Sequence, residues 1–427
     1  MEKDNETIFI KASKLIALLC AAAALLGLLS GCGPRVKSIE PDSEPSAEAL
    51  WPTGSDPSAP VADFTKLDFW NHGTPDKYRA RYARSCDLSG ETLPEDPAEL
   101  GLIEFDSRTK WPETLPDGFD PSKIMEAEKD PGLGVRALHE KGITGAGVTI
   151  AILDQPLLTD HVEYKDRLRY YRDLNDWTLY PEDYMASMHG PAVASIAVGK
   201  TTCVAPGADL LLVAFDFAKA QNWSLQAFAE ALEHLLDVNE TLPQEKKVRV
   251  LSVSRGMDPS SDGYDDWKKA VLRAKEAGIF VVTVSLDQDY PGMGLVGMSR
   301  ELYADPNDFG ASRPGIFYQN DFYYDTGAFY MPDKRLFVPM DFRTLASPTG
   351  TEDYARYACG GMSWAVPWFA GVYALACQVK PDITPEEFWQ EAYTTGKVVE
   401  FEKDSNTYRL DRVMDPTALI AALQEKS

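Results

Sequence analysis

The sequence predicts a three-layer α/β fold, with a mostly parallel central sheet covered by helices on both faces. Short, continuous apolar runs occur at Val148–Asp154, Leu210–Phe215, Val248–Ser254 and Ile279–Ser285. Such runs are typical of strands buried on both faces of a parallel sheet. Segments with helical spacing separate them, which favours alternating strands and helices. Functional side chains in such sheets gather at the carboxyl ends of strands, and Asp154 ends the first run.

Four segments carry the helical signals. Small residues follow His189, Ser224 can cap an apolar 3–4 pattern, and Gly278 can end a helix. A fourth, strongly apolar segment includes a proline that a first helical turn tolerates. The predicted helices are His189–Ala197, Leu225–Leu235, Trp267–Ala277 and Ser363–Val379, the last with Pro367 in its first turn.

Bulk composition limits the classes of partner. The chain has 427 residues, 44% apolar and 25% charged, which is enough for one large domain or two smaller ones. Its formal net charge is −24. Such a surface repels polyanions, so nucleic acid and anionic lipid headgroups are not expected ligands.

The N-terminus has the pattern of a secretory signal. Lys11 and Lys14 precede an apolar run, Leu15–Leu29, that is shorter than a membrane-spanning helix prefers. The ending Leu-Ser-Gly-Cys32 resembles the bacterial lipobox, which implies a lipidated Cys32 and a chain held at the extracytoplasmic face of the cell membrane. An uncleaved anchor helix or an ordinary signal peptide are the alternatives.

The expected organisation has four parts. Residues 1–31 form the signal peptide, and residues 32–62, rich in Pro, Ser and acidic residues, form a flexible tether. Residues 63–131 form an N-terminal extension that is a propeptide, a docking arm or part of the main fold. Residues 132–427 form the main domain.

The cysteines show no metal-site spacing. Besides Cys20 and Cys32, four remain that either pair or stay reduced: Cys86, Cys203, Cys359 and Cys377. No EF-hand-like loop is present in the sequence, so no residue pattern supports structural calcium. No cofactor is expected to be required.

Three local contexts carry chemistry when taken together. Asp154 follows a buried strand, His189 begins a small-residue helix, and Ser363 follows two glycines and opens an apolar helix. A carboxylate, an imidazole and a hydroxyl are the components of an activated serine nucleophile, and a helix N-terminus can hold a developing oxyanion. Each context alone has an ordinary structural explanation, but the order Asp, His, Ser is that of subtilisin.

The motifs resemble those of the subtilisin-like serine peptidases, or subtilases. Ile152-Leu-Asp154, His189-Gly-Pro-Ala-Val-Ala and Gly361-Met-Ser363-Trp-Ala-Val-Pro match the three family motifs in part. Leu138–Gly145 and Val204–Ala208 resemble two further family segments, and the resemblance extends from about Gly132 to Thr395. It implies a subtilisin-like fold and a serine endopeptidase acting on extracytoplasmic proteins or peptides.

The resemblance implies a role for each group. Ser363 would attack the peptide carbonyl, His189 would take and return the proton, and Asp154 would orient the imidazole. The segment Ser254-Arg255-Gly256 resembles the strand edge on which an extended substrate pairs. Structural calcium is frequent in the family, but no residues here correspond to a calcium site.

The oxyanion position departs from the family pattern. Asp287 occupies the place of the usual asparagine, and an ionised aspartate donates no hydrogen bond. Met362 replaces the threonine before the serine. The sequence therefore predicts a slow or selective protease, with a catalytically impaired subtilase-like binding or sensor lipoprotein as the alternative. A solute-binding lipoprotein is less favoured, because no pair of similar lobes is evident. His72, His139, His161 and His234 are expected to be structural or solvent-facing.

Overall fold

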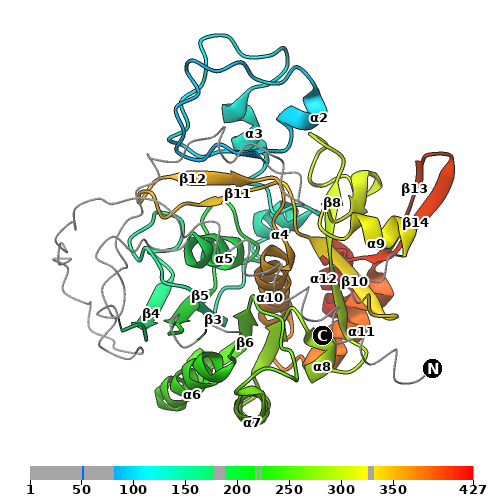
Figure 1. The fold of residues 1–427 in the computed structure, drawn as a ribbon. Coiled ribbons are helices and arrows are strands. Elements are labelled where there is room, and N and C mark those ends of the chain that lie inside the picture. The colour runs from blue at the N-terminus through cyan, green and yellow to red at the C-terminus, as the bar shows by residue number, and fades with distance from the viewer. Residues whose placement is uncertain are drawn as a thin grey trace.

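The computed structural model describes residues 51, 81–176, 188–216, 220, 224–325 and 331–426 (Figure 1). The predicted signal peptide, Cys32, most of the tether and His72 lie outside these residues. Within the part described, no helix is both long and apolar enough to cross a membrane.

The central sheet has five parallel strands in the order β4-β5-β3-β6-β7. The bounds are β3 Thr149–Asp154, β4 Leu168–Asp173, β5 Asp209–Ala214, β6 Val248–Val253 and β7 Phe280–Thr283. All six residues of β3 are buried, because neighbours pair on both sides and helices cover both faces. In the register, Asp154 lies opposite Ala214 at the carboxyl edge of the sheet.

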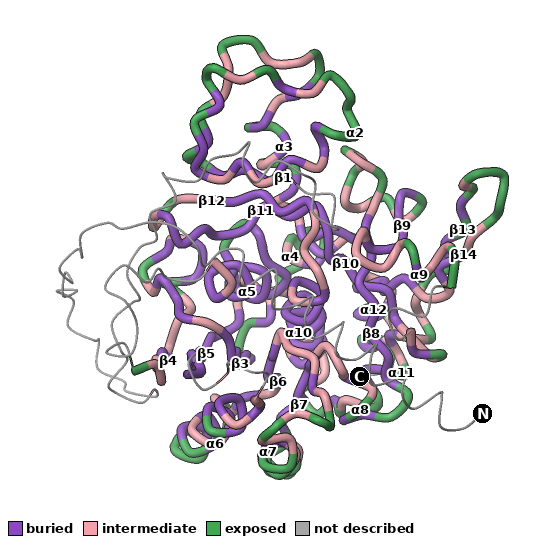
Figure 2. Tube along the Cα trace, viewed as in Figure 1, coloured by how far each residue is buried: buried purple, intermediate pink, exposed green. Residues whose placement is uncertain are grey.

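Helices cover both faces of this sheet. Helices α5 (His189–Val198) and α10 (Met362–Val379) pack together on one face, while α6 (Gln226–Thr241) and α7 (Tyr264–Glu276) lie on the other (Figure 1). Figure 2 shows α5 and α10 almost wholly buried, whereas α6 and α7 keep an exposed face. The predicted α/β class with a mostly parallel central sheet is confirmed.

A second, mixed sheet extends the fold beyond the elements predicted from the sequence. Its order is β13-β14-β10-β8-β9, with β8, β10 and β14 parallel and the two outer strands antiparallel to their neighbours. The bounds are β8 Gly294–Arg300, β9 Ser312–Pro314, β10 Arg335–Pro339, β13 Lys397–Lys403 and β14 Asn406–Val413. The helices in and after this region are α8 Leu286–Asp289, α9 Gln319–Tyr324, α11 Pro385–Thr395 and α12 Pro416–Lys426.

The N-terminal region packs over a hairpin that contacts α5. The hairpin comprises β11 (Arg343–Ala346) and β12 (Tyr354–Tyr357). Helices α2 and α3 of the N-terminal region lie above this hairpin in Figure 1. The elements of that region are β1 Arg81–Tyr82, α2 Pro97–Leu100, β2 Ile103–Glu104, α3 Pro121–Ala127 and, leading into the main fold, α4 Val135–Glu140.

Three boundaries differ from the sequence prediction. Helix α6 begins at Gln226, although the Ser224 hydroxyl still accepts a hydrogen bond from its amide at 3.2 Å. Strand β7 ends at Thr283 because the chain turns into α8 after only two intervening residues. Pro367 lies inside α10 rather than in its first turn, because the helix already begins at Met362.

Candidate active site

Asp154 occupies the last position of the central strand β3. Only 3% of its surface is exposed. Its Oδ1 accepts hydrogen bonds from the Gln155 amide at 2.8 Å and from Nδ1 of His189 at 2.6 Å. A buried carboxylate with two donors is held in one orientation, and it favours a proton on the imidazole nitrogen that faces it.

His189 is the first residue of α5, and its side chain is 21% exposed. Since Nδ1 bonds to the carboxylate, the neutral ring presents Nε2 as the proton acceptor. This is the arrangement that a general base for a hydroxyl requires.

Gly190 allows α5 to begin directly against the chain that follows Asp154. A Cβ at this position would lie 2.4 Å from the carbonyl oxygen of Gln155 and 2.5 Å from that of Pro156. Both are main-chain atoms and cannot swing aside. The glycine therefore permits the close approach that joins His189 to Asp154.

Ser363 lies in the first turn of α10, partly exposed, directly after a strained glycine turn. Gly361 has φ +65°, a conformation that residues with a Cβ rarely adopt. Pro367 has no amide hydrogen for the carbonyl of Ser363, four residues earlier. The hydroxyl of Ser254 donates to that carbonyl instead, at 2.9 Å. The proline and Ser254 together fix the main chain of the serine.

Trp364 brings the start of α10 against the imidazole. Its ring centroid lies 5.1 Å from that of His189 and 5.2 Å from that of Tyr357. The indole packs so closely over Gly360 that a Cβ there would lie 1.9 Å from it. Because Ser363 directly precedes Trp364, the contact between the Trp364 and His189 rings places the serine and histidine segments side by side. Trp364 was not predicted as a site residue from the sequence, although its place next to Ser363 was a usable signal.

Asp287 lies in the short helix α8 and is partly exposed. The preceding Leu286 is 1% exposed. Nearer the strand end, the Ser285 hydroxyl accepts from the Met257 amide at 3.1 Å. Met362 is 7% exposed, and its side chain offers no polar hydrogen. The residues aligned with the family's oxyanion position thus supply no amide side chain.

The segment predicted to bind substrate follows β6. The Arg255 guanidinium carbon lies 5.4 Å from the ring centroid of Phe228 on α6. Its main-chain groups are bonded within the chain, the amide to Val253 at 2.7 Å and the carbonyl to the Val284 amide at 3.0 Å. Gly256 lies beside Ser285, whose hydroxyl would be 3.6 Å from an added Cβ.

Asp341 supports the glycine turn that precedes Ser363. This carboxyl group is 1% exposed, and it accepts from the Gly360 amide at 3.0 Å and the Ile316 amide at 2.8 Å. Burial raises its pKa to about 7, against the opposing effect of these hydrogen bonds and of Arg300. Only two residues separate Gly360 from Ser363, so Asp341 holds the main chain that leads to the serine.

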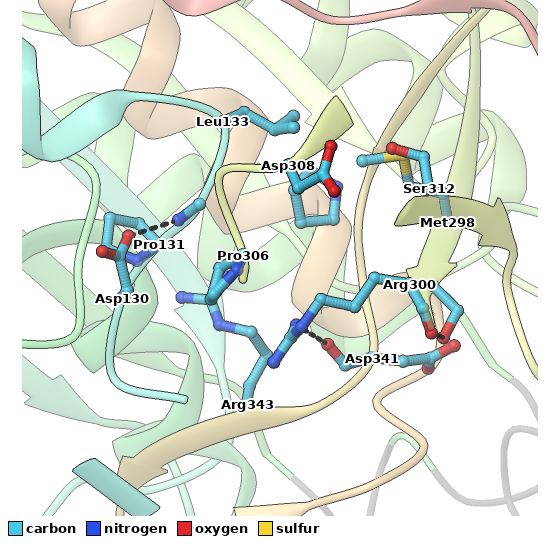
Figure 3. Close-up of a pocket in the computed structure, with 13 residues that line it drawn as sticks. Asp130, Pro131, Leu133, Met298, Arg300, Pro306, Asp308, Ser312, Asp341 and Arg343 are labelled. Atoms are coloured by element: carbon cyan, nitrogen blue, oxygen red, sulfur yellow. Dashed lines mark hydrogen bonds between the residues drawn. The ribbon is translucent and has the colours of Figure 1, made fainter. Parts of the chain in front are cut away.

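A cavity lies beside Asp341, lined also by Asp130, Arg300 and Arg343 (Figure 3). Arg343 is 1% exposed and donates from Nη2 to the Thr202 carbonyl at 3.0 Å. Burial, followed by the charge of Arg300, lowers the pKa of Arg343 to about 10. Arg300 donates to the main-chain carbonyls of Asp341 and Phe342. The cavity is therefore next to Asp341, the carboxyl group that binds the Gly360 amide.

The three other histidines that the structure describes bond outside this site. His139 bonds to the Val204 carbonyl, His161 to the Asp353 carbonyl, and His234 to the Tyr170 hydroxyl. Over the described ranges, no cluster of three metal-ligating side chains is found. The four cysteines described, Cys86, Cys203, Cys359 and Cys377, form no disulfide.

Comparison with known proteins gives a family match and a distant relative. Residues 145–285, about a third of the chain, match the model of the subtilase family. Subtilisin-like protease PopC of Myxococcus xanthus (strain DK1622) is 25% identical over 223 residues, covering 50% of this chain and 45% of PopC. The match therefore spans less than half of the length of that relative.

Two solved structures are also similar. The prenylagaramide maturation protease PagA has a TM-score of 0.45 and 16% identity, over 69% of this chain and 99% of its own. A serine-to-alanine mutant of the protease domain of PatA has a TM-score of 0.45 and 18% identity, over 67% and 98%.

The family match includes Asp154 and His189 and ends before Ser363. Residues 145–285 are therefore similar to the subtilase family, and half of the chain is similar to a subtilisin-like protease.

Proposed function

We propose that the protein is a serine endopeptidase that hydrolyses extracytoplasmic proteins or peptides through Asp154, His189 and Ser363. The observation that carries the proposal is the 2.6 Å hydrogen bond between Asp154 and His189. The His189 ring contacts the ring of Trp364, the residue that follows Ser363. A buried carboxylate, an imidazole and a helix-terminal serine in this order are the groups that acyl transfer needs.

In the proposed reaction the Ser363 oxygen bonds to the peptide carbonyl carbon while His189 takes the hydroxyl proton. The imidazolium is stabilised by Asp154 and returns the proton to the leaving amine, as the peptide C–N bond breaks. Water then hydrolyses the acyl-enzyme with His189 again acting as the base. No metal or cofactor takes part in these steps.

Oxyanion stabilisation is the weak part of the site. Loss of one side-chain donor costs about 100- to 1,000-fold in kcat in serine peptidases. Asp287 supplies no such donor while it is ionised. We therefore expect slow turnover, with the main-chain N–H groups at the start of α10 carrying most of the stabilisation.

The second candidate is a subtilase-like binding or sensor protein with little turnover. This candidate is favoured because Asp287, and not an asparagine, occupies the oxyanion position. The retained Asp154–His189 pair argues against it, because binding alone does not need an oriented base.

We also propose that the chain is anchored in the cell membrane by a lipid on Cys32 and faces out of the cytoplasm. The sequence Leu-Ser-Gly-Cys32 after an apolar run supports this. Expression with a clickable palmitate analogue tests it. Label in the wild type that Cys32→Ala abolishes is expected, and equal label in both would overturn it.

Proteolysis of an unfolded protein substrate tests the enzymatic proposal. The wild type should generate new N-termini in the substrate, and His189→Ala and Ser363→Ala should not. If the wild type binds the substrate without cleaving it, and both variants bind equally well, the binding candidate is correct.

A further inference from the structure

Residues 81–130 have an apolar core of their own. Nine buried side chains form a cluster separate from the main core, and the rings of Phe105, Trp111 and Phe119 pack edge to face within it, with centroids 5.1–6.4 Å apart. The region is therefore a folded unit, which we call the N-terminal unit. Figure 1 shows it above the β11–β12 hairpin.

The N-terminal unit encloses an arginine from that hairpin. Arg356 is wholly buried, and its Nε and Nη2 donate to the two carboxylate oxygens of Glu128, both at 2.9 Å. Its Nη1 donates to the carbonyls of Gly101 and Ile103 at 2.8 and 2.7 Å. Its main-chain amide donates to the Phe105 carbonyl at 2.7 Å.

All of these acceptors belong to the N-terminal unit. Separation of the unit would leave a guanidinium and a carboxylate without their partners, and removing one member of such a buried pair is strongly unfavourable. A detachable propeptide would not be expected to leave such a pair behind. We therefore expect the N-terminal unit to stay with the rest of the fold.

The same unit reaches the turn that precedes the nucleophile. Strand β12 ends at Tyr357, and the chain passes through Cys359, Gly360 and Gly361 to Ser363. The Cys359 amide donates to Oε1 of Glu104 at 3.3 Å, and Glu104, at the end of β2, is 3% exposed. The next amide, that of Gly360, donates to Asp341. Two buried carboxyl groups on different segments thus hold two successive amides.

We propose that the N-terminal unit is an intramolecular positioning element for Ser363, and that Glu104 is its positioning residue. Glu104 fixes the Cys359 amide, and the Arg356 contacts hold β12 in register against the unit. Because only three residues separate Cys359 from Ser363, loosening this amide moves the start of α10. The proposal rests on the proposed peptidase function, and it assigns to residues 81–130 a role that persists in the active enzyme.

The test compares Glu104→Ala, Glu104→Gln and the matched control Glu95→Gln, an exposed glutamate of the same unit. Hydrogen exchange of the peptide spanning Cys359–Trp364 reports the turn, whether or not the protein is active. We expect exchange about tenfold faster in Glu104→Ala, the effect of losing one buried hydrogen bond to a charged group. Glu104→Gln, which keeps an acceptor oxygen, should restore most of the protection, and Glu95→Gln should match the wild type.

Kinetics and intact mass complete the test. In Glu104→Ala, kcat should fall about 10- to 100-fold with KM within about twofold, because positioning of the nucleophile acts after substrate binding. Protein labelled at Ser363 should retain residues 81–130 in its intact mass. Unchanged exchange in Glu104→Ala, or an active species that lacks these residues, would overturn the inference. Faster exchange in the variant beside a wild type that cleaves nothing would refute only the peptidase function.

Discussion

Stability should depend on pH through Asp341, and Asp341→Asn should remove that dependence. The carboxyl is 1% exposed, and its burial raises its pKa from 3.8 to about 7. A raised acid pKa means that the folded state holds the proton more tightly than the unfolded state does. The contribution to stability is therefore complete below about pH 4 and is lost as the pH rises through about 7.

The size of the effect follows from the two pKa values. Linkage between 3.8 and about 7 gives a loss of about 2.5 kcal/mol in the free energy of unfolding between pH 5 and pH 8. The Asn variant cannot titrate at this position, so the difference in stability between the two proteins should change by that amount. The stability of the wild type relative to the Asn variant should be higher at pH 5 than at pH 8.

Urea unfolding at pH 5 and pH 8 measures this, with equal m-values as the check that both proteins unfold alike. Asn offers one acceptor oxygen for the two amides of Gly360 and Ile316, so a constant loss of about 1–3 kcal/mol is also expected at both pH values. A stability difference that is the same at pH 5 and pH 8 would refute the assignment of a raised pKa to this group.

Three further predictions concern single sites. Arg356→Met should lower the free energy of unfolding by about 3–5 kcal/mol, since it leaves Glu128 buried and without its bidentate partner; a loss below about 1 kcal/mol in chemical denaturation would contradict the buried pair. Gly190→Ala should lower the free energy of unfolding by about 1–3 kcal/mol and remove most of the activity, because an added Cβ would lie 2.4 and 2.5 Å from main-chain oxygens. The control Gly90→Ala, with nothing within 4 Å of the added Cβ, should melt like the wild type, and equal melting points of the two variants would argue against the close approach at Gly190. Asp154→Asn should keep the fold and lower kcat about 10,000-fold, and a pH–rate profile with unchanged kcat would show that the imidazole needs no carboxylate.

Much of the central sheet could be predicted because its strands are continuous apolar runs. β3, β5 and β6 lie within one residue of the predicted ranges, since burial on both faces favours apolar side chains at most positions. The second sheet was not predicted. Its strand β8 contains two glycines and an arginine, and β14 is mostly polar, so neither carries a clear periodic signal.

The site was predictable where motif residues carry it and not where tertiary contacts do. Asp154 and His189 were paired from their motifs, and the structure joins them at 2.6 Å. Glu104 lies 255 residues before Cys359, and nothing in a local pattern links a glutamate on a short strand to a distant amide. Asp341 was missed for the same reason, because its importance comes from burial and from two main-chain donors.

The account depends most on whether Ser363 is an activated nucleophile. Labelling of the purified chain with a fluorophosphonate probe, followed by mass spectrometry of the modified peptide, tests this directly. We predict label on Ser363 that is absent from Ser363→Ala and strongly reduced in His189→Ala. An unlabelled Ser363 in folded wild-type protein, or label that persists in His189→Ala at the wild-type rate, would contradict it.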